Sequence, residues 1–353
     1  MGGAFGLYTH IRNNRVRSIF LVAALFFLVA MVTYGVTLVG VGMKYAGPVS
    51  GIMSYAAKIF WGYLPFAFGA TALWVGIGYV SNTAMISWAT GAQDVTRESH
   101  PELYRITENL CISRGMTVPR IQVLETPALN AFASGVNENQ YTVTVTTGLL
   151  EALDKHELEG VIAHELTHIR NGDVKLMIFA VLIVGVISFF GEMMVRGRWR
   201  FSSSSSSSSD NRNSGGFAIV IGIVILLLAW LFAVLIRFAL SRSREYLADA
   251  GAVELTKNPD ALISALLKIS GRADIEGVPS GIMDMCIEND PDDWGDIFST
   301  HPSIAKRLNA LQQYAGGLVP DEAQRVGPPG IEQRNSVPEI VEKRGPWARR
   351  PLP

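Results

Sequence analysis

Long uncharged stretches dominate the pattern of hydrophobic and polar positions along the chain. Ser18 to Met43 carries no charged side chain, and neither does Ile59 to Gln93, although Pro65 interrupts the second run. A helix needs about 20 apolar residues to cross a bilayer, and four stretches reach or approach that length. The predicted membrane spans, arranged as two hairpins, cover residues 18–43, 59–81, 176–195 and 217–239.

The segments between and after these hairpins have the patterns of folded, polar structure. Short β-branched runs separated by turn residues predict a small sheet, and the apolar periodicity around them predicts helices. Asn171-Gly172 is a typical helix stop just before the third span. We expect helices over 101–113, 149–153 and 156–171 and strands over 120–124, 130–136 and 141–146. The segment after the fourth span reads as mostly helical.

These patterns divide the chain into membrane hairpins and the two parts of one soluble domain. The hairpin regions are residues 1–93 and 174–240, and the soluble parts are residues 94–173 and 241–315. The serine run Ser202–Ser209 lies in the loop 197–216, and a run of this kind predicts a flexible, solvated connection. Proline, glycine and mixed charges predict a disordered tail over 316–353.

Composition and charge place the chain in a membrane and limit its partners. Hydrophobic residues make up 49% of the 353 residues and charged residues only 17%, which excludes an ordinary soluble domain. Lysine and arginine near the span ends favour a cytoplasmic soluble domain, although the arginines of 196–200 argue for the opposite orientation. The two cysteines, Cys111 and Cys286, agree with a reducing compartment and read as ordinary buried thiols. The formal net charge of −1 gives no indication of nucleic-acid binding.

The candidate chemistry begins with His164-Glu165-Leu166-Thr167-His168, directly before the third span. Two histidines four residues apart lie on one face of a helix, so both imidazoles can bind one metal ion. The intervening Glu165 can then take a proton from a water held by that metal. This pattern is typical of a zinc peptidase.

A third ligand is predicted from the topology. A hairpin returns the chain to the membrane face that it left, so the second hairpin brings Glu245 to the side of His168. Glu245 and Asp249 share one helix face, so the first can bind the metal while the second accepts a hydrogen bond from a ligand histidine. The alternative is a solvated helix in which these carboxylates pair with Arg242 and Arg244.

The joint set of motifs resembles the HtpX group of membrane metallopeptidases, relatives of the CAAX-prenyl protease, over roughly residues 5–315. The matching segments are His164-Glu165-Leu166-Thr167-His168, Asn171-Gly172-Asp173, Arg244-Glu245-Tyr246-Leu247-Ala248-Asp249, Asn130-Ala131-Phe132-Ala133 with Gly135, Thr146-Thr147-Gly148-Leu149-Leu150 and Thr300-His301-Pro302. The serine-rich loop and the long tail depart from the family pattern.

The resemblance implies one zinc ion per chain, held by His164, His168 and Glu245, with Glu165 as the catalytic base. It further implies that His301 and Arg307 lie near the transition state. The segment Asn130-Ala131-Phe132-Ala133 would be an edge strand on which an extended substrate adds. Relatives of this kind act in the quality control of damaged membrane proteins during stress.

We therefore expect an α+β membrane protein with four transmembrane helices and a mainly helical, zincin-like catalytic domain that contains a small β-sheet. Its partners would be protein or peptide substrates and the lipid bilayer, in a bacterial inner membrane with both termini cytoplasmic. A more selective processing protease and a catalytically silent scaffold or holdase remain alternatives. An intramembrane protease is a weaker one, suggested by Asn258-Pro259-Asp260, and a transporter would need ionisable residues inside the spans.

Overall fold

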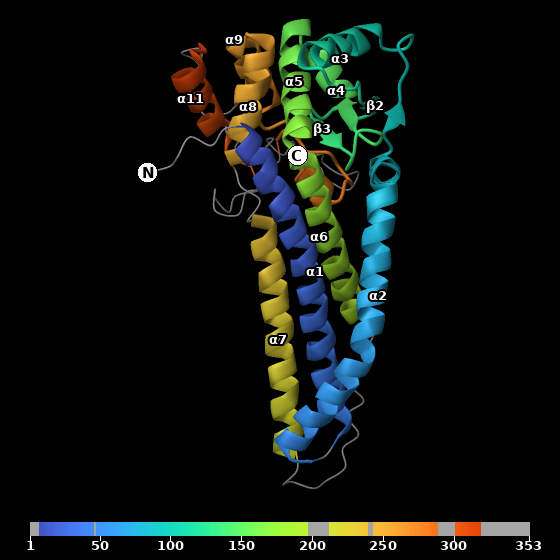
Figure 1. Ribbon diagram of the computed structural model, residues 1–353. Coiled ribbons are helices and arrows are strands. Elements are labelled where there is room, and N and C mark those ends of the chain that lie inside the picture. Colours follow the sequence, from blue (N-terminus) through green and yellow to red (C-terminus); the bar gives the residue numbers. More distant parts are fainter. Residues whose placement is uncertain (1–6, 46, 197–211, 239–242, 289–300, 319–353) are drawn as a thin grey trace, which may run out of the picture.

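The molecule consists of a bundle of long helices with a cap of shorter helices and a small sheet at one end (Figure 1). The computed structural model describes residues 7–45, 47–196, 212–238, 243–288 and 301–318. The serine run, Thr300 and the tail beyond residue 318 lie outside these residues. The expectations for the loop and the tail therefore stay predictions.

The bundle contains helices α1 (Leu7–Lys44), α2 (Val49–Thr90), α6 (Asp173–Arg196) and α7 (Arg212–Phe238). Among the described helices, three are long and apolar enough to cross a membrane, with candidate spans Val16–Lys44, Val49–Thr90 and Gly215–Ile236. The remaining expected span falls in α6, which packs against α1. Large apolar side chains such as Phe20, Phe66 and Leu227 are more than half exposed on these helices. A lipid environment removes the cost of that exposure.

Helix α2 extends well beyond its predicted span of 59–81. Its 42 residues correspond to about 63 Å, roughly twice the thickness of the hydrocarbon core. Pro65 lies inside the helix, where a proline removes one backbone hydrogen bond and bends the axis, and α2 is visibly bent in its first half (Figure 1). The C-terminal part of α2 is held against the sheet region. Gln140, just before β4, donates to two α2 carbonyls at 3.1 Å, and Ser87 of α2 donates to Gln122 of β2 at 3.0 Å.

The sheet has four strands in the order β1-β2-β4-β3. The strands are β1 (Gln93–Asp94), β2 (Arg120–Leu124), β3 (Ala131–Ser134) and β4 (Thr142–Thr146). Strands β2 and β4 are parallel, whereas the other two pairs are antiparallel. The three predicted strands are thus confirmed, with β3 shorter than expected. Gly135 ends β3 at a φ of 110°, and a Cβ there would lie 2.6 Å from the carbonyl oxygen of Gln140.

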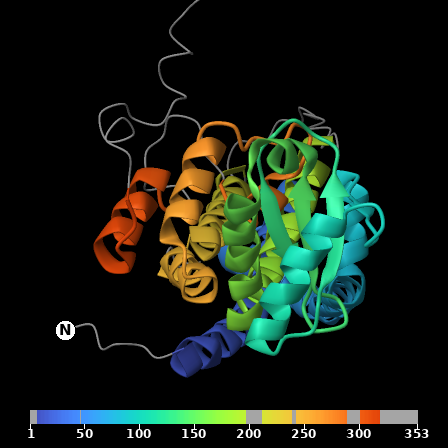
Figure 2. The ribbon, with the colours of Figure 1, turned by 90° about the horizontal axis from the view of Figure 1, so that it is seen from above.

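The cap is built around α5, the most buried helix of the soluble domain. Figure 2 shows the sheet and α3 on one side of α5 and α8, α9 and α11 on the other. The cap helices are α3 (Pro101–Arg114), α4 (Thr147–Ala152), α5 (Lys155–Asn171), α8 (Ser243–Thr256), α9 (Pro259–Ile269), α10 (Ser280–Met283) and α11 (Ile304–Ala315). Asp154 and Glu157 form a capping box at the start of α5, and Gly172, with a φ of 72°, ends it. The predicted helix stop is confirmed.

Candidate metal centre and active site

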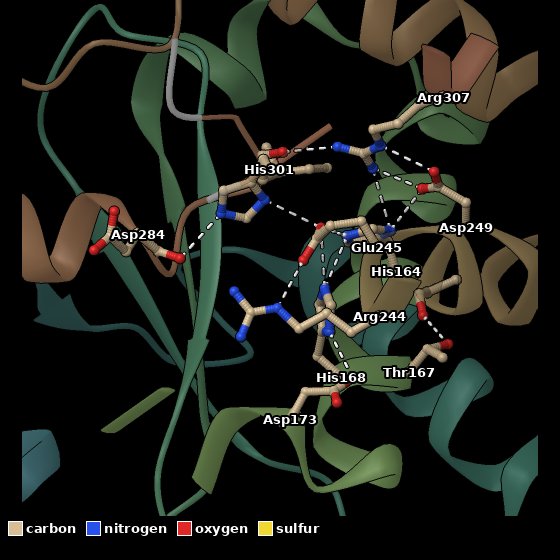
Figure 3. Close-up of polar contacts among 12 residues, drawn as sticks. His164, Thr167, His168, Asp173, Arg244, Glu245, Asp249, Asp284, His301 and Arg307 are labelled. Atoms are coloured by element: carbon tan, nitrogen blue, oxygen red, sulfur yellow. Dashed lines mark hydrogen bonds and ion pairs between the residues drawn. The ribbon is translucent and has the colours of Figure 1, made fainter. Parts of the chain in front are cut away.

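The predicted metal ligands converge at the centre of the cap (Figure 3). His164 and His168 lie one turn apart on α5, with their Nε2 atoms 3.1 Å from each other. Oε2 of Glu245, from α8, lies 3.6 Å from each of these nitrogens. All three side chains are buried. The structure therefore brings two sequence-distant segments together in the arrangement that the hairpin argument predicted.

Small residues allow the close approach of α8 to α5. Ala248 and Ala252 are fully buried, and a Cβ at Gly251 would collide with the side chain of Thr167 on α5. A larger residue at position 251 would separate the helices, and Glu245 would then lie farther from the two imidazoles.

Each imidazole is oriented by a carboxylate on its other nitrogen. Nδ1 of His164 lies 2.9 Å from Asp249 Oδ1, and Nδ1 of His168 lies 3.0 Å from Asp173 Oδ2. A carboxylate partner fixes the proton on Nδ1 and leaves the Nε2 lone pair for a metal. The role of Asp173 was missed in the sequence, where it appears only as part of the Asn171-Gly172-Asp173 motif. The sequence feature that could have indicated this role is Gly172. A glycine that ends a helix in the left-handed conformation turns the chain, and the next residue, Asp173, then lies beside the last turn of α5.

The donor set fits a divalent cation. With a proton on each Nδ1, the two Nε2 atoms and the Glu245 carboxylate are three acceptors that face one another. Oε2 of Glu245 makes no hydrogen bond of normal geometry to any described residue. Burial alone would raise the pKa of Glu245, but His301 and His168 hold it well below its usual value. Burial also opposes a charge on His168, yet Glu245 and Asp173 raise its pKa to about 10, so a metal cation that binds here would displace the proton from its Nε2. The site therefore attracts positive charge, and two imidazoles with one carboxylate are ligands that zinc accepts.

Glu165 is placed as a candidate proton acceptor. It follows His164 on α5 and is only 1% exposed. Its Oε1 has no hydrogen-bond partner among the described residues. Burial raises the pKa of Glu165 above its usual value, even though His164 and His168 partly offset that effect. A carboxylate with a raised pKa and a free oxygen is suited to proton transfer near neutral pH.

His301 and Arg307 occupy different positions at the site. Nδ1 of His301 lies 3.2 Å from Glu245 Oε2, and its Nε2 lies 3.0 Å from the carbonyl oxygen of Asp284. Arg307, in contrast, binds Asp249 through two nitrogens at 2.9 and 2.6 Å. Its remaining terminal nitrogen donates to the carbonyl oxygen of Ile287 at 2.8 Å. Arg307 is thus a buried partner of Asp249 whose Nη2 also lies 3.5 Å from Nδ1 of His164, whereas His301 contacts the third predicted ligand, Glu245.

The segment expected to receive substrate forms the edge strand β3 and packs against α5. The Asn130 side chain is fully buried and donates to the carbonyl oxygens of Ala273 and Glu288 at 2.8 and 3.0 Å. The chain itself covers part of the outer edge, because Phe132 forms an isolated antiparallel bridge with Cys286. Asn130 therefore holds the neighbouring segment in place, and the backbone N–H of Ile287 donates to the Ala131 carbonyl at 2.9 Å, so this segment lies along the first part of the edge of β3.

Two alternative interpretations can be compared with these contacts. Of the arginines offered as partners for a solvated helix, Arg242 lies outside the described residues. Arg244 contacts Glu245, with its Nε 3.3 Å from Oε1, but both are buried. The Asn258 side chain caps α9 by accepting from a backbone N–H at 3.1 Å. The triplet that suggested an intramembrane protease is thus the start of a helix in the cap.

The chain is similar to known proteases over most of its length. The sequence matches the model of peptidase family M48 over residues 97–315. A protease HtpX homolog from Bacteroides fragilis is 38% identical over 319 residues, which cover 88% of this chain and 99% of that protein. A protease HtpX homolog from Ligilactobacillus salivarius is 33% identical over 308 residues, covering 87% and 99%. The crystal structure of S. mikatae Ste24p aligns with a TM-score of 0.42 and 20% identity over 71% of this chain and 58% of that chain, a likeness too low to support a conclusion.

Proposed function

Because this chain belongs to peptidase family M48 and is an HtpX-type membrane protease, we propose that it is a zinc-dependent endopeptidase. Its substrates are unfolded or damaged proteins, including membrane proteins, and its role is protein quality control under stress. The substrate class follows from the resemblance to the HtpX group. An edge strand that binds the main chain of a substrate gives little side-chain selectivity, which suits such a role.

One observation carries the proposal: the two Nε2 atoms and the Glu245 carboxylate face one another in a buried site, beside a carboxyl group with a free oxygen. His164, His168 and Glu245 would hold one zinc ion, which when bound would make a coordinated water more acidic and polarise the scissile carbonyl. A scaffold or holdase has no use for this combination of convergent acceptors and a buried base.

The other side chains hold the ligands and move protons. Asp249 and Asp173 orient the two imidazoles through Nδ1. Glu165 accepts a proton from the attacking water and delivers it to the leaving amine. His301 remains a candidate donor to the reacting carbonyl because it lies beside Glu245. An extended substrate adds along β3 and displaces the bridge at Cys286.

For the membrane, we propose four spans, with α6 as the additional one beside the three candidate spans. The two hairpins then separate the soluble domain into residues 94–173 and 241–315. The zincin-like catalytic domain and both termini face the cytoplasm of a bacterium, and the spans lie in its inner membrane. The excess of lysine and arginine on that side supports this orientation.

Cleavage of an unfolded model protein by detergent-purified enzyme tests the function. The enzyme is stripped with chelator and then supplied with zinc, beside Glu165→Gln treated identically. We expect zinc-dependent cleavage by the wild type, and a variant that binds one zinc per chain without turnover. Equal activity of the two preparations would refute the role of Glu165. Zinc binding by both without any cleavage would favour the scaffold or a highly selective processing protease.

A further inference from the structure

Arg244 is a buried cation whose donors are largely unused. It precedes Glu245 in α8 and is only 2% exposed. Its Nε lies 3.3 Å from Oε1 of Glu245, but neither Nη1 nor Nη2 has a hydrogen-bond partner among the described residues. Buried guanidinium nitrogens without partners are rare because the lost hydration is not replaced.

Arg307, the second buried arginine of the site, shows that this fold can give each nitrogen of a buried guanidinium a hydrogen-bond acceptor. Arg307 is equally buried, and all three of its nitrogens bind oxygen atoms of Asp249 or Ile287. Arg307 therefore has no nitrogen left without a partner, whereas two nitrogens of Arg244 have none within the described segments. The unpaired nitrogens of Arg244 belong to a residue next to a metal ligand.

Building on the proposed peptidase function, we propose that Arg244 is a catalytic residue that binds the scissile carbonyl oxygen through Nη1 and Nη2. In Figure 3 its guanidinium lies beside Glu245 and His168, and its terminal nitrogens make no hydrogen bond to either residue. A planar guanidinium offers two parallel donors to one ligand. Donors of this kind stabilise the negative charge that develops on the oxygen when water attacks, and a buried setting strengthens them.

A purely structural role fits the contacts less well. If Arg244 only held Glu245 in place, its terminal nitrogens would be expected to share that carboxylate in a bidentate pair. Instead, only Nε approaches Glu245, on Oε1, while Oε2 faces the imidazoles. The C-terminal carboxylate of a peptide has a similar oxygen chemistry to the oxyanion, so the experiment must separate these two ligands.

The test compares Arg244→Met and Arg244→Lys with the wild type, with Arg272→Met as a control at an exposed arginine. Three quantities are measured: bound zinc per chain, kcat and KM for peptides with free and amidated C-termini, and the affinities of two inhibitors. One inhibitor is a phosphinic peptide, which carries a tetrahedral oxyanion. The other is an uncleavable analogue of the ground-state substrate.

We expect Arg244→Met to keep its zinc and to lose about 100- to 1,000-fold in kcat with both kinds of peptide. Its affinity for the phosphinic peptide should fall by a similar factor, while its affinity for the ground-state analogue stays within about threefold. Arg244→Lys should recover part of both losses, and Arg272→Met should match the wild type. The lysine variant keeps the test decisive if the methionine variant does not fold.

Three results would overturn the proposal. Unchanged kcat and phosphinic-peptide affinity would show that Arg244 does not touch the reacting oxygen. Loss of zinc from both Arg244 variants would assign it to the support of Glu245, and a loss confined to peptides with a free carboxylate would make it a terminus-binding residue. In each case the wild type still cleaves peptides. A wild type without zinc-dependent cleavage would instead refute the proposed function itself.

Discussion

The pair formed by Arg307 and Asp249 allows a sharp test of how the site is held together. The family resemblance implied that Arg307 lies near the transition state, whereas its nitrogens bind Asp249, the carboxylate that orients His164. We therefore expect Arg307→Met to act through Asp249, on folding and on metal binding, before it acts on turnover.

The magnitudes follow from burial and geometry. Removing one partner of a buried ion pair costs about 3–5 kcal/mol, and Asp249 is only 2% exposed. Burial disfavours its charge, but Arg307 and His164 lower the pKa of Asp249 to about 2, so its charge depends on these partners. Asp249→Asn removes the negative charge of the acceptor that orients the ligand histidine, which should reduce zinc affinity by about 10- to 100-fold, or about 1.4–2.7 kcal/mol.

A double-mutant cycle measures the coupling. Wild type, Arg307→Met, Asp249→Asn and the double variant are unfolded by urea in detergent without metal, followed by tryptophan fluorescence. Zinc affinity is measured by competition with a chelator. Because the residues share one ion pair, the two losses should not add. The free energy of unfolding of the double variant should lie about 0.5–3 kcal/mol above the value expected from adding the two single losses. Its zinc affinity should be no lower than that of Asp249→Asn.

One result would refute this reasoning. If Arg307→Met kept the stability and zinc affinity of the wild type but lost kcat, the arginine would act on the substrate. Additive effects in the cycle would likewise show that the two side chains do not depend on each other in solution.

Three further predictions concern the supporting structure. Gly148→Ala should lower stability by about 1–3 kcal/mol, seen as a lower urea midpoint, because the new Cβ would collide with the Pro127 carbonyl. Burial raises the pKa of Cys111 to about 11 and also raises that of Cys286, so a maleimide at pH 8 should label both thiols only after denaturation. Asp154→Ala should cost about 0.5–1 kcal/mol through the lost helix cap. Since backbone N–H donors lower the pKa of Asp154 from 3.8, this contribution is present above that value and is lost as the pH falls through the lower folded-state pKa.

Matched variants control these experiments. Gly62→Ala lies inside α2 and introduces a Cβ with nothing within 4 Å, so it should not lower the urea midpoint and can raise it slightly through helix propensity. Glu151→Ala, at an exposed position, should not reproduce the effect of Asp154→Ala at any pH. Rapid labelling of native Cys286 would contradict its burial, and a Gly148→Ala protein as stable as the wild type would contradict the close approach of Pro127.

Local sequence patterns determined the elements of this protein. The spacing of His164 and His168 places both on one helix face whatever surrounds them, because the helical repeat fixes directions over four residues. Gly172 ended α5 as predicted, because a glycine tolerates the left-handed conformation of a helix cap. The long apolar runs predicted membrane helices from length alone, and the return of a hairpin predicted that Glu245 would meet the histidines.

Only the tertiary structure decided which buried charges pair with one another. Asp173 orients His168, Arg307 binds Asp249, and two nitrogens of Arg244 have no partner in the described part of the chain. Nothing in the spacing distinguishes Arg244 from Arg307, because both are basic residues on polar segments. Their roles differ because the groups around each guanidinium come from separate elements: α5, α8, α11 and the segment beside β3. The packing of these elements decides which of the groups lie within hydrogen-bond distance. Sequence periodicity fixes the direction of a side chain within its own helix, but the position of its partner depends on how separate elements pack.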